Sequence, residues 1–294
     1  MGNRTTLLAI ASAVALGFAG CGDDEDDKAA TPAASTPAAT TEAPPAEPTA
    51  FAVSITGSGK DIKMTAPKTT PAGLTEIQLT LEAKGDHGVQ LVRIDGDHSL
   101  AEIAKAGDAW GDDGKPLADW ITTAGGVPGK TGTTTSVLQV LEPGKYVAFD
   151  LETDAAAEFT VDGGDAAAEL PETPATVTMK EYSFAAEGLT AGKQQVTVDN
   201  VGKEPHFIVA APLAKGKTVA DATKFFATEG EGASGPPPVD FEAGESTAVI
   251  EGGTKQVVDL DLKTGKYAFV CFIPDRAGGP PHIAKGMISE IEVP

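Results

Sequence analysis

Cysteine, histidine and positive charge are all scarce in this sequence. Its 294 residues include two cysteines, four histidines and 22 lysines and arginines against 43 acidic residues, for a formal net charge of -21. So acidic a chain is poorly suited to nucleic acid, and we expect no nucleic-acid partner; a cation or a basic protein fits better. Two cysteines cannot build a disulfide framework, so the fold must be stabilised by its core or by a bound group.

The N-terminus has the features of a bacterial export signal. Arg4 precedes an apolar run over residues 7–16, which is too short to span a bilayer comfortably and ends in the small-residue pattern LGFAGC. We therefore predict a signal peptide at residues 1–20 and, because the segment resembles a lipoprotein lipobox, lipidation of Cys21. The expected location is extracytoplasmic, with the lipid anchor in the outer face of a bacterial membrane. An uncleaved N-terminal anchor is the alternative, and it leaves the protein on the same side.

Residues 21–49 lack the apolar side chains that a core needs. They hold seven acidic residues and one lysine, and Ala, Pro and Thr make up most of the rest. This composition predicts a disordered acidic linker between the membrane and the folded part of the chain.

The folded part contains an internal repeat. Residues 73–92 align with residues 192–211, and residues 136–150 align with residues 257–271 at an offset only two residues larger. Two matches at nearly the same spacing indicate a tandem duplication, with the joint near residues 162–174.

Each repeat consists of short runs in which Val, Ile, Phe and Tyr recur at every second position, separated by Gly, Pro or Asn. Such runs are typical of antiparallel strands. Helical spacing of apolar residues appears at 99–111 and at 218–230. The sequence thus predicts an all-β protein of two tandem Greek-key β-sandwich domains, at residues 50–165 and 173–294, each with a short helical excursion.

Four residues of the second repeat could hold a metal ion. They are His206, Cys271, His282 and Met287. Two imidazoles, a thiolate and a thioether are borderline-to-soft donors, and a His₂Cys plane with a weak axial Met is typical of a one-electron copper site. Zinc seldom binds a thioether, and calcium takes only oxygen ligands. Taken singly, each residue has a plainer interpretation: a buried thiol, a core histidine or a packing methionine.

The segment "GKYAFVCFIPDRAGGPPHIAKGMISEIEV" (265–293) resembles the C-terminal signature of the cupredoxins, the blue copper family, in which an aromatic strand leads through Cys, His and Met into a last strand. The resemblance implies cupredoxin-like domains and one copper ion in the second of them. His206, Cys271 and His282 would then be equatorial ligands and Met287 the axial one. It also implies that His282 is the ligand nearest the surface, at a rim of low charge where a redox partner docks. Phe207 stands where many members have an Asn that ties the ligand loops together.

The first repeat retains one ligand position. His87 matches His206, but Asp150 stands where Cys271 does, and no His or Met follows it in residues 151–161. We expect this domain to bind no copper in the same way and to act as a spacer, partner surface or stabiliser. The segment AGGVPGKT (124–131) fits a loose phosphate-binding loop, but a β-rich stretch follows it where a helix is required, so we expect no nucleotide.

Together these patterns predict a membrane-anchored extracytoplasmic copper protein of type 1 character. It would transfer electrons to or from a redox partner protein and would not be an enzyme. Two alternatives stay open: a copper carrier or scavenger, and a metal-free cupredoxin-like interaction module.

Overall fold

The computed structural model describes residues 47–85, 87–164, 166–228 and 236–294. The predicted signal peptide, the lipidation site Cys21 and nearly all of the predicted linker lie outside these residues. Thr49, the last residue of that linker, is already the first residue of a strand. Within the described ranges, no helix has the length and apolar character needed to cross a membrane.

The first half of the described chain forms a β-sandwich with one helix, α1 (Leu100–Gly111). Its strands are β1 (Thr49–Thr56), β2 (Lys63–Thr65), β3 (Thr69–Leu81), β4 (Gly88–Ile94), β5 (Ile121–Pro128), β6 (Thr134–Leu141), β7 (Gly144–Asp150) and β8 (Ala156–Gly164), with a 3₁₀ turn η1 (Gly59–Asp61). β3 pairs in parallel with β1 and antiparallel with β6. β4 and β7 pair antiparallel, with β5 on the other side of β4 and β8 on the other side of β7. We call this unit the first sandwich.

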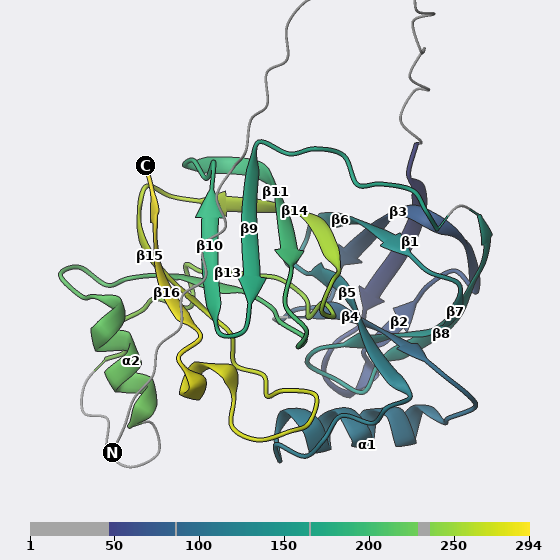
Figure 1. Cartoon of the computed structure of the whole chain (residues 1–294). Coiled ribbons are helices and arrows are strands. Elements are labelled where there is room, and N and C mark those ends of the chain that lie inside the picture. The colour runs from purple at the N-terminus through teal and green to yellow at the C-terminus, as the bar shows by residue number, and fades with distance from the viewer. Residues whose placement is uncertain (1–46, 86, 165, 229–235) are drawn as a thin grey trace, which may run out of the picture. The chain divides into compact units, whose positions relative to one another are not determined.

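The second half repeats this pairing and also contains one helix, α2 (Val219–Ala227). Its strands are β9 (Ala175–Lys180), β10 (Ser183–Glu187), β11 (Gly192–Asn200), β12 (Val209–Pro212), β13 (Glu245–Ser246), β14 (Lys255–Leu262), β15 (Gly265–Val270) and β16 (Ile288–Val293), with a 3₁₀ turn η2 (His282–Lys285). β11 pairs in parallel with β9 and antiparallel with β14. β12 and β15 pair antiparallel and are flanked by β13 and β16. We call this unit the second sandwich (Figure 1).

The all-β prediction and both helical excursions are confirmed. Each helix starts at a capping box, Ser99 with Glu102 before α1 and Thr218 with Asp221 before α2, which satisfies the first backbone N–H groups. The strands bury alternate residues, as in β1, where Phe51 is fully buried and its neighbours are not. The predicted domain boundaries stay predictions.

One strand pair joins the two sandwiches. β14 lies antiparallel to β6, with Val257 opposite Leu138, so that one twelve-stranded sheet runs through both units. Beside this pair the buried amides of Gln139 and Gln256 hydrogen-bond to each other. The sequence patterns did not predict this junction.

Equivalent tyrosines tie the same turn in both sandwiches. The hydroxyl of Tyr146 donates to the Glu142 carbonyl oxygen at 2.9 Å, and that of Tyr267 donates to the Lys263 carbonyl oxygen at 3.1 Å. Both rings are buried. In each unit this bond fixes the entry into the strand, β7 or β15, that ends at Asp150 or leads directly to Cys271.

Candidate metal centre

The backbone brings the four predicted ligands to one end of the second sandwich. His206 lies between β11 and β12, where its backbone exchanges hydrogen bonds of 3.0 and 2.9 Å with Ile250. Cys271 directly follows β15, His282 opens η2, and Met287 directly precedes β16. Three of the four therefore come from the connection between the last two strands, as expected from the sequence.

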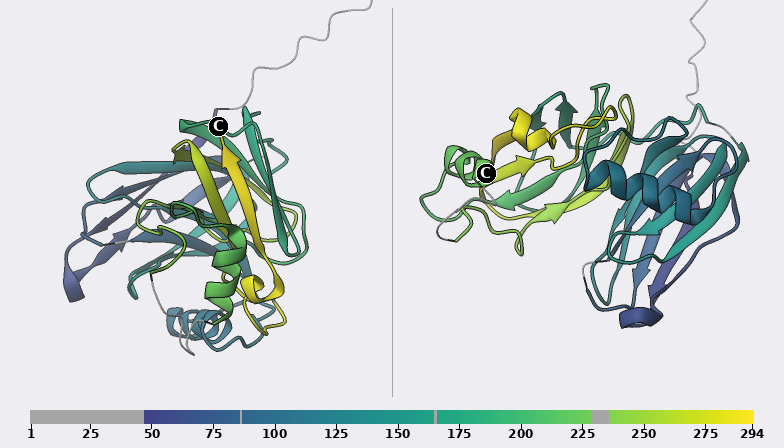
Figure 2. Two further views of the ribbon diagram at one scale, coloured as in Figure 1. Left: turned by 90° about the vertical axis from the view of Figure 1, so that its left-hand side faces the viewer. Right: turned by 90° about the horizontal axis from the view of Figure 1, so that it is seen from below.

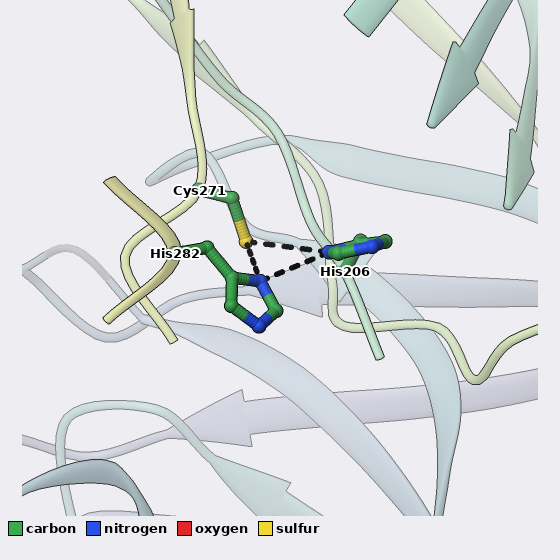
Figure 3. A group of neighbouring side chains, drawn as sticks. All are labelled: His206, Cys271 and His282. Carbon is green, nitrogen blue, oxygen red and sulfur yellow. Dashed lines mark hydrogen bonds between the residues drawn. The ribbon is translucent and has the colours of Figure 1, made fainter. Parts of the chain in front are cut away.

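Three of these side chains meet (Figure 3). The Nδ1 atoms of His206 and His282 are 3.0 Å apart, and the Cys271 sulfur is 3.4 Å from Nδ1 of His282 and 4.0 Å from Nδ1 of His206. Donors bound to one ion lie roughly 3 to 4 Å apart, because each is about 2.0 to 2.3 Å from it. In the described part of the chain, this is the only group of three or more His, Cys, Asp or Glu side chains whose ligand atoms lie within 4.8 Å of one another.

Met287 is hydrogen-bonded through its backbone to two of these residues, and its side chain is buried. Its N–H donates to the His282 carbonyl oxygen at 2.9 Å, and its own carbonyl oxygen accepts from the Cys271 N–H at 3.3 Å. The side chain is fully buried in the core cluster that also contains Cys271. Met287 thus lies beside the three converging side chains.

The protonation states of His206 and His282 suit metal ligands. Burial, reinforced by the proximity of His282, lowers the pKa of His206 to about 4. Burial also lowers the pKa of His282, although the Asp275 carboxylate opposes that shift. Both imidazoles are therefore neutral near pH 7, which is the form that binds a metal.

The surroundings of the Cys271 thiol shift its pKa in two opposite directions. Burial raises its pKa to about 12, and hydrogen bonds from the backbone N–H groups of Phe207 and Ile273 pull in the opposite direction. Those two donors favour a thiolate, but a buried thiolate also needs a nearby positive charge. A metal cation between the sulfur and the two Nδ1 atoms would supply it, so the residues fit a bound metal ion.

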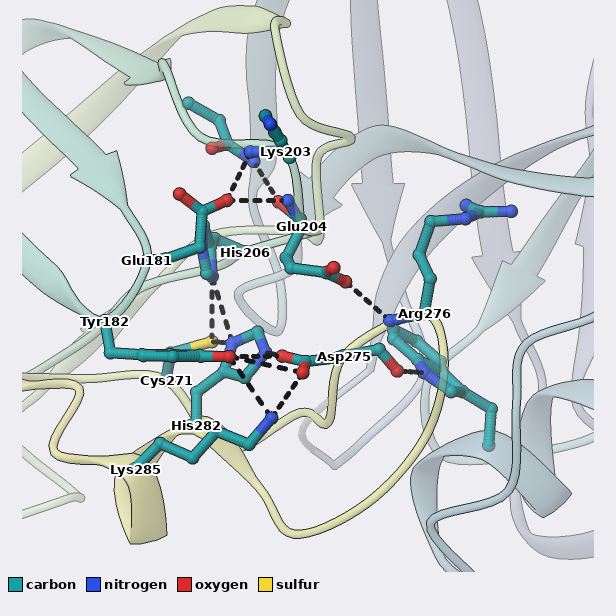
Figure 4. Close-up of polar contacts among 12 residues, drawn as sticks. Glu181, Tyr182, Lys203, Glu204, His206, Cys271, Asp275, Arg276, His282 and Lys285 are labelled. Atoms are coloured by element: carbon teal, nitrogen blue, oxygen red, sulfur yellow. Dashed lines mark hydrogen bonds and ion pairs between the residues drawn. The ribbon is translucent and has the colours of Figure 1, made fainter.

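The surroundings of His282 differ in charge from the rim that the family resemblance implies. His282 is fully buried, as are His206, Cys271 and Met287, and charged residues lie beside it. Its Nε2 atom is 2.9 Å from Oδ1 of Asp275. The same carboxylate forms an ion pair with Lys285 and accepts a hydrogen bond of 3.0 Å from the Tyr182 hydroxyl (Figure 4).

This polar cover fixes which nitrogen of His282 faces the thiol. Burial tends to raise the pKa of the Asp275 carboxyl, but hydrogen bonds from Lys285, Tyr182 and His282 outweigh burial and hold that pKa below its usual value. An ionised carboxylate can only accept, so Nε2 of His282 carries the proton and Nδ1 presents its lone pair to the site. Asp275 therefore sets the tautomer that a metal ligand needs.

A second residue absent from the sequence prediction ties the ligand segments together. The Glu204 carboxylate, two residues before His206, accepts a hydrogen bond of 2.7 Å from the backbone N–H of Arg276. This bond joins the His206 segment to the connection between Cys271 and His282. Asn200 holds the other end of the His206 segment by donating to the Glu204 carbonyl oxygen at 2.9 Å. The sequence offered one signal for these supporting contacts: Asp275 is a charged residue inside the interval between Cys271 and His282.

The first sandwich has a different arrangement at the equivalent place. Nδ1 of His87 is 2.8 Å from Oδ2 of Asp150, and both residues are 95% buried. Thr153 donates to the same carboxylate oxygen at 2.6 Å, and Nε2 of His87 lies 3.2 Å from the Lys84 carbonyl oxygen. Both imidazole nitrogens thus lie within hydrogen-bonding distance of protein oxygen atoms.

No protein-family model matches the chain, and no curated protein matches it. Among solved structures, the chain is similar to reduced auracyanin from the photosynthetic bacterium Roseiflexus castenholzii, at 18% identity and a TM-score of 0.26, over 40% of this chain and 94% of that one. It is also similar to the copper nitrite reductase from Nitrosomonas europaea, at 12% identity and a TM-score of 0.23, over 84% of this chain and 94% of that one. The metal assignment rests on the side chains of this chain.

Proposed function

We propose that this protein binds one copper ion in the second sandwich and transfers electrons without converting a substrate of its own. His206, Cys271 and His282 would be the equatorial ligands and Met287 the axial one. The observation that carries the proposal is the convergence of one thiol and two imidazole Nδ1 atoms, all fully buried, within 4.8 Å of one another. Copper held by such a set supplies a one-electron couple.

Electron transfer is favoured over copper delivery by the enclosure of the site. The three converging side chains have no exposed surface, and the Asp275–Lys285 ion pair lies over His282. A carrier has to release its ion to a partner, which requires at least one ligand to be open to exchange. A buried and hydrogen-bonded ligand set is suited instead to hold the ion through both oxidation states.

The location and the partner are part of the same proposal, and their support comes from the sequence. The apolar N-terminal run and the lipobox-like LGFAGC support a location at the outer face of a bacterial membrane with a lipid anchor at Cys21. The net charge of -21 favours a redox partner with a basic docking surface.

Copper titration of the purified protein tests the proposal. We expect uptake of one copper ion per chain and an intense visible absorption band from the copper–thiolate bond. In Cys271→Ser the band should vanish, because a hydroxyl cannot replace the thiolate. Reversible one-electron voltammetry of the loaded protein would support transfer, and rapid loss of copper to a competing chelator would support delivery.

A colourless protein that takes up no stoichiometric copper would refute the proposal. In that case the metal-free interaction module becomes the better description. Retention of the full visible band in Cys271→Ser would show that copper binds elsewhere.

A further inference from the structure

The connection that carries Cys271 and His282 makes an extended contact with the first sandwich. The Trp110 indole N–H, from α1, donates to the Asp275 carbonyl oxygen at 2.8 Å. The Leu117 N–H donates to the Arg276 carbonyl oxygen at 2.7 Å. Both donors belong to the first sandwich, and both acceptors lie in the interval between the two ligands. Figure 2 shows α1 running beside this C-terminal segment.

The Arg276 side chain strengthens the same contact. Its Nη2 group donates to the Ile121 carbonyl oxygen of β5 at 2.8 Å, and its Nη1 group pairs with Oε2 of Glu251 at 2.7 Å. The Glu251 carboxylate also accepts from the hydroxyl of Thr123 in β5 at 3.2 Å. One guanidinium thus binds both sandwiches through the geometry of its planar fork, which lysine cannot reproduce.

Glycines allow the two backbones to approach closely at the far end of the contact. The Gly279 N–H donates to the Gly114 carbonyl oxygen at 2.8 Å. Gly278 has φ +80°, and a Cβ there would lie 2.4 Å from the same carbonyl oxygen. Any larger residue at this position would push the metal-binding connection away from the first sandwich. The sequence GGPP, which adds length but no donor to the ligand interval, therefore has a structural use.

One peptide unit transmits this contact to the site. The C=O of Asp275 is held by Trp110 of the first sandwich, and the N–H of Arg276, in the same peptide unit, is held by Glu204 of the His206 segment. The side chain of Asp275 starts from this fixed peptide and reaches Nε2 of His282 at 2.9 Å. Figure 4 shows the Asp275 carboxylate between Tyr182, Lys285 and His282.

We propose that the first sandwich is the support for the metal site of the second: Trp110 and Arg276 are positioning residues that fix Asp275, and through Asp275 the tautomer and orientation of His282. This inference rests on the proposed copper site, and it assigns a role to the sandwich that lacks the matching cysteine. An imidazole that donates a hydrogen bond to a carboxylate becomes a stronger metal ligand, which favours Cu(II) over Cu(I).

Two variants and two matched controls test this support in the full chain. Trp110→Phe keeps a ring and removes the N–H donor. Trp120→Phe is its control, because the Trp120 ring stacks on His98 with their centroids 3.7 Å apart, and among the described residues no hydrogen bond joins its indole to the ligand interval. Arg276→Lys keeps the charge and removes the fork; Arg93→Lys is its control, on a pair with Glu142 of the first sandwich. Thermal unfolding verifies that each variant is folded.

The readouts are copper affinity, reduction potential and the tautomer of His282. We expect Trp110→Phe and Arg276→Lys to weaken Cu(II) binding roughly 2- to 10-fold, the size of one lost hydrogen bond, and to raise the potential. Asp275→Asn should weaken binding about 10- to 100-fold. In the metal-free protein, ¹⁵N NMR should show more of the Nδ1–H tautomer of His282 in all three, with both controls like wild type.

The two proposals fail in different ways. If the wild type binds no copper, the proposed function fails, yet the tautomer measurement on the metal-free protein still tests the support. If Trp110→Phe and Arg276→Lys match wild type in tautomer, affinity and potential while Asp275→Asn differs, the first sandwich is not the support. An Asp275→Asn variant identical to wild type removes Asp275 itself from the proposal.

Discussion

Each sandwich has a histidine beside the residue at the end of an equivalent strand, β7 or β15. The chemistry of that neighbouring residue differs between the two sandwiches. In the first, His87 meets Asp150, and the carboxylate satisfies the imidazole directly. In the second, His206 meets Cys271 and a second imidazole, and none of the three neutral groups satisfies the others fully. The same fold therefore yields a directly bonded histidine–aspartate pair in one copy and a cluster of one thiol and two imidazoles in the other.

The difference also extends to the connection that follows. In the first sandwich only five residues separate Asp150 from β8, whereas the second has a long connection that contributes His282 and Met287 and touches the first sandwich. The short connection adds no further His, Cys or Met to the first sandwich. The long one carries the proposed ligands His282 and Met287 and also the contacts with the first sandwich.

The largest expected effect comes from removing the equivalent histidines. His206→Ala deletes an equatorial donor and should abolish the copper–thiolate band, because Cys271 and His282 would be the only equatorial ligands left and the axial Met287 is a weak donor. His87→Ala should leave the band intact in a folded sample. The measurement is the visible spectrum at one equivalent of copper.

The comparison can be tested from the other direction with Asp150→Cys. We expect no new visible band, because the first sandwich offers no second imidazole near that position. A band from this variant combined with Cys271→Ser would show that a His–Cys pair is enough for copper and that the long connection is not required.

A second prediction concerns the stability of the metal-free protein. His87→Ala leaves the buried Asp150 carboxylate without its main partner, which should lower the free energy of unfolding by about 3 kcal/mol. His206→Ala leaves no buried carboxylate unpaired, so its loss should be smaller. Urea unfolding of both variants with a chelator present measures the difference. Equal losses in the free energy of unfolding would show that the His87–Asp150 pair contributes no more to stability than His206 does.

The smallest expected effect is a loss of stability at alkaline pH that comes from Tyr146 of the first sandwich. Burial raises the pKa of Tyr146 to about 12, against 10 in the unfolded chain. Between pH 10 and 12 the unfolded chain loses this proton first, so stability present below pH 10 falls as the pH rises, by at most about 3 kcal/mol. Urea unfolding at pH 9 and pH 11 should show a smaller drop in Tyr146→Phe than in wild type. An unchanged drop would show that other groups cause the alkaline loss.

Much of this structure could be predicted from local pattern. Alternation of apolar residues indicated the strands, Ser99 and Thr218 stand at the start of the predicted helices, and the order of His206, Cys271 and His282 indicated a common site. The burial of His282 could not be predicted this way, because it depends on Tyr182, Asp275 and Lys285. Tyr182 is 100 residues from His282, and nothing in its neighbours marks it as part of the site.

The sequence by itself determined the alternation that makes two β-sandwiches, the single thiol of the second one and the chemistry of its donors, because these depend on residue type and short spacing. Tertiary structure decided that Asp275 faces Nε2 of His282, that Glu204 links the His206 segment to Arg276, and that Trp110 and Arg276 join the connection between β15 and β16 to the first sandwich. Those contacts link segments far apart along the chain. Which of many possible polar pairs forms is settled only when the cores of both sandwiches fix the backbones that carry them.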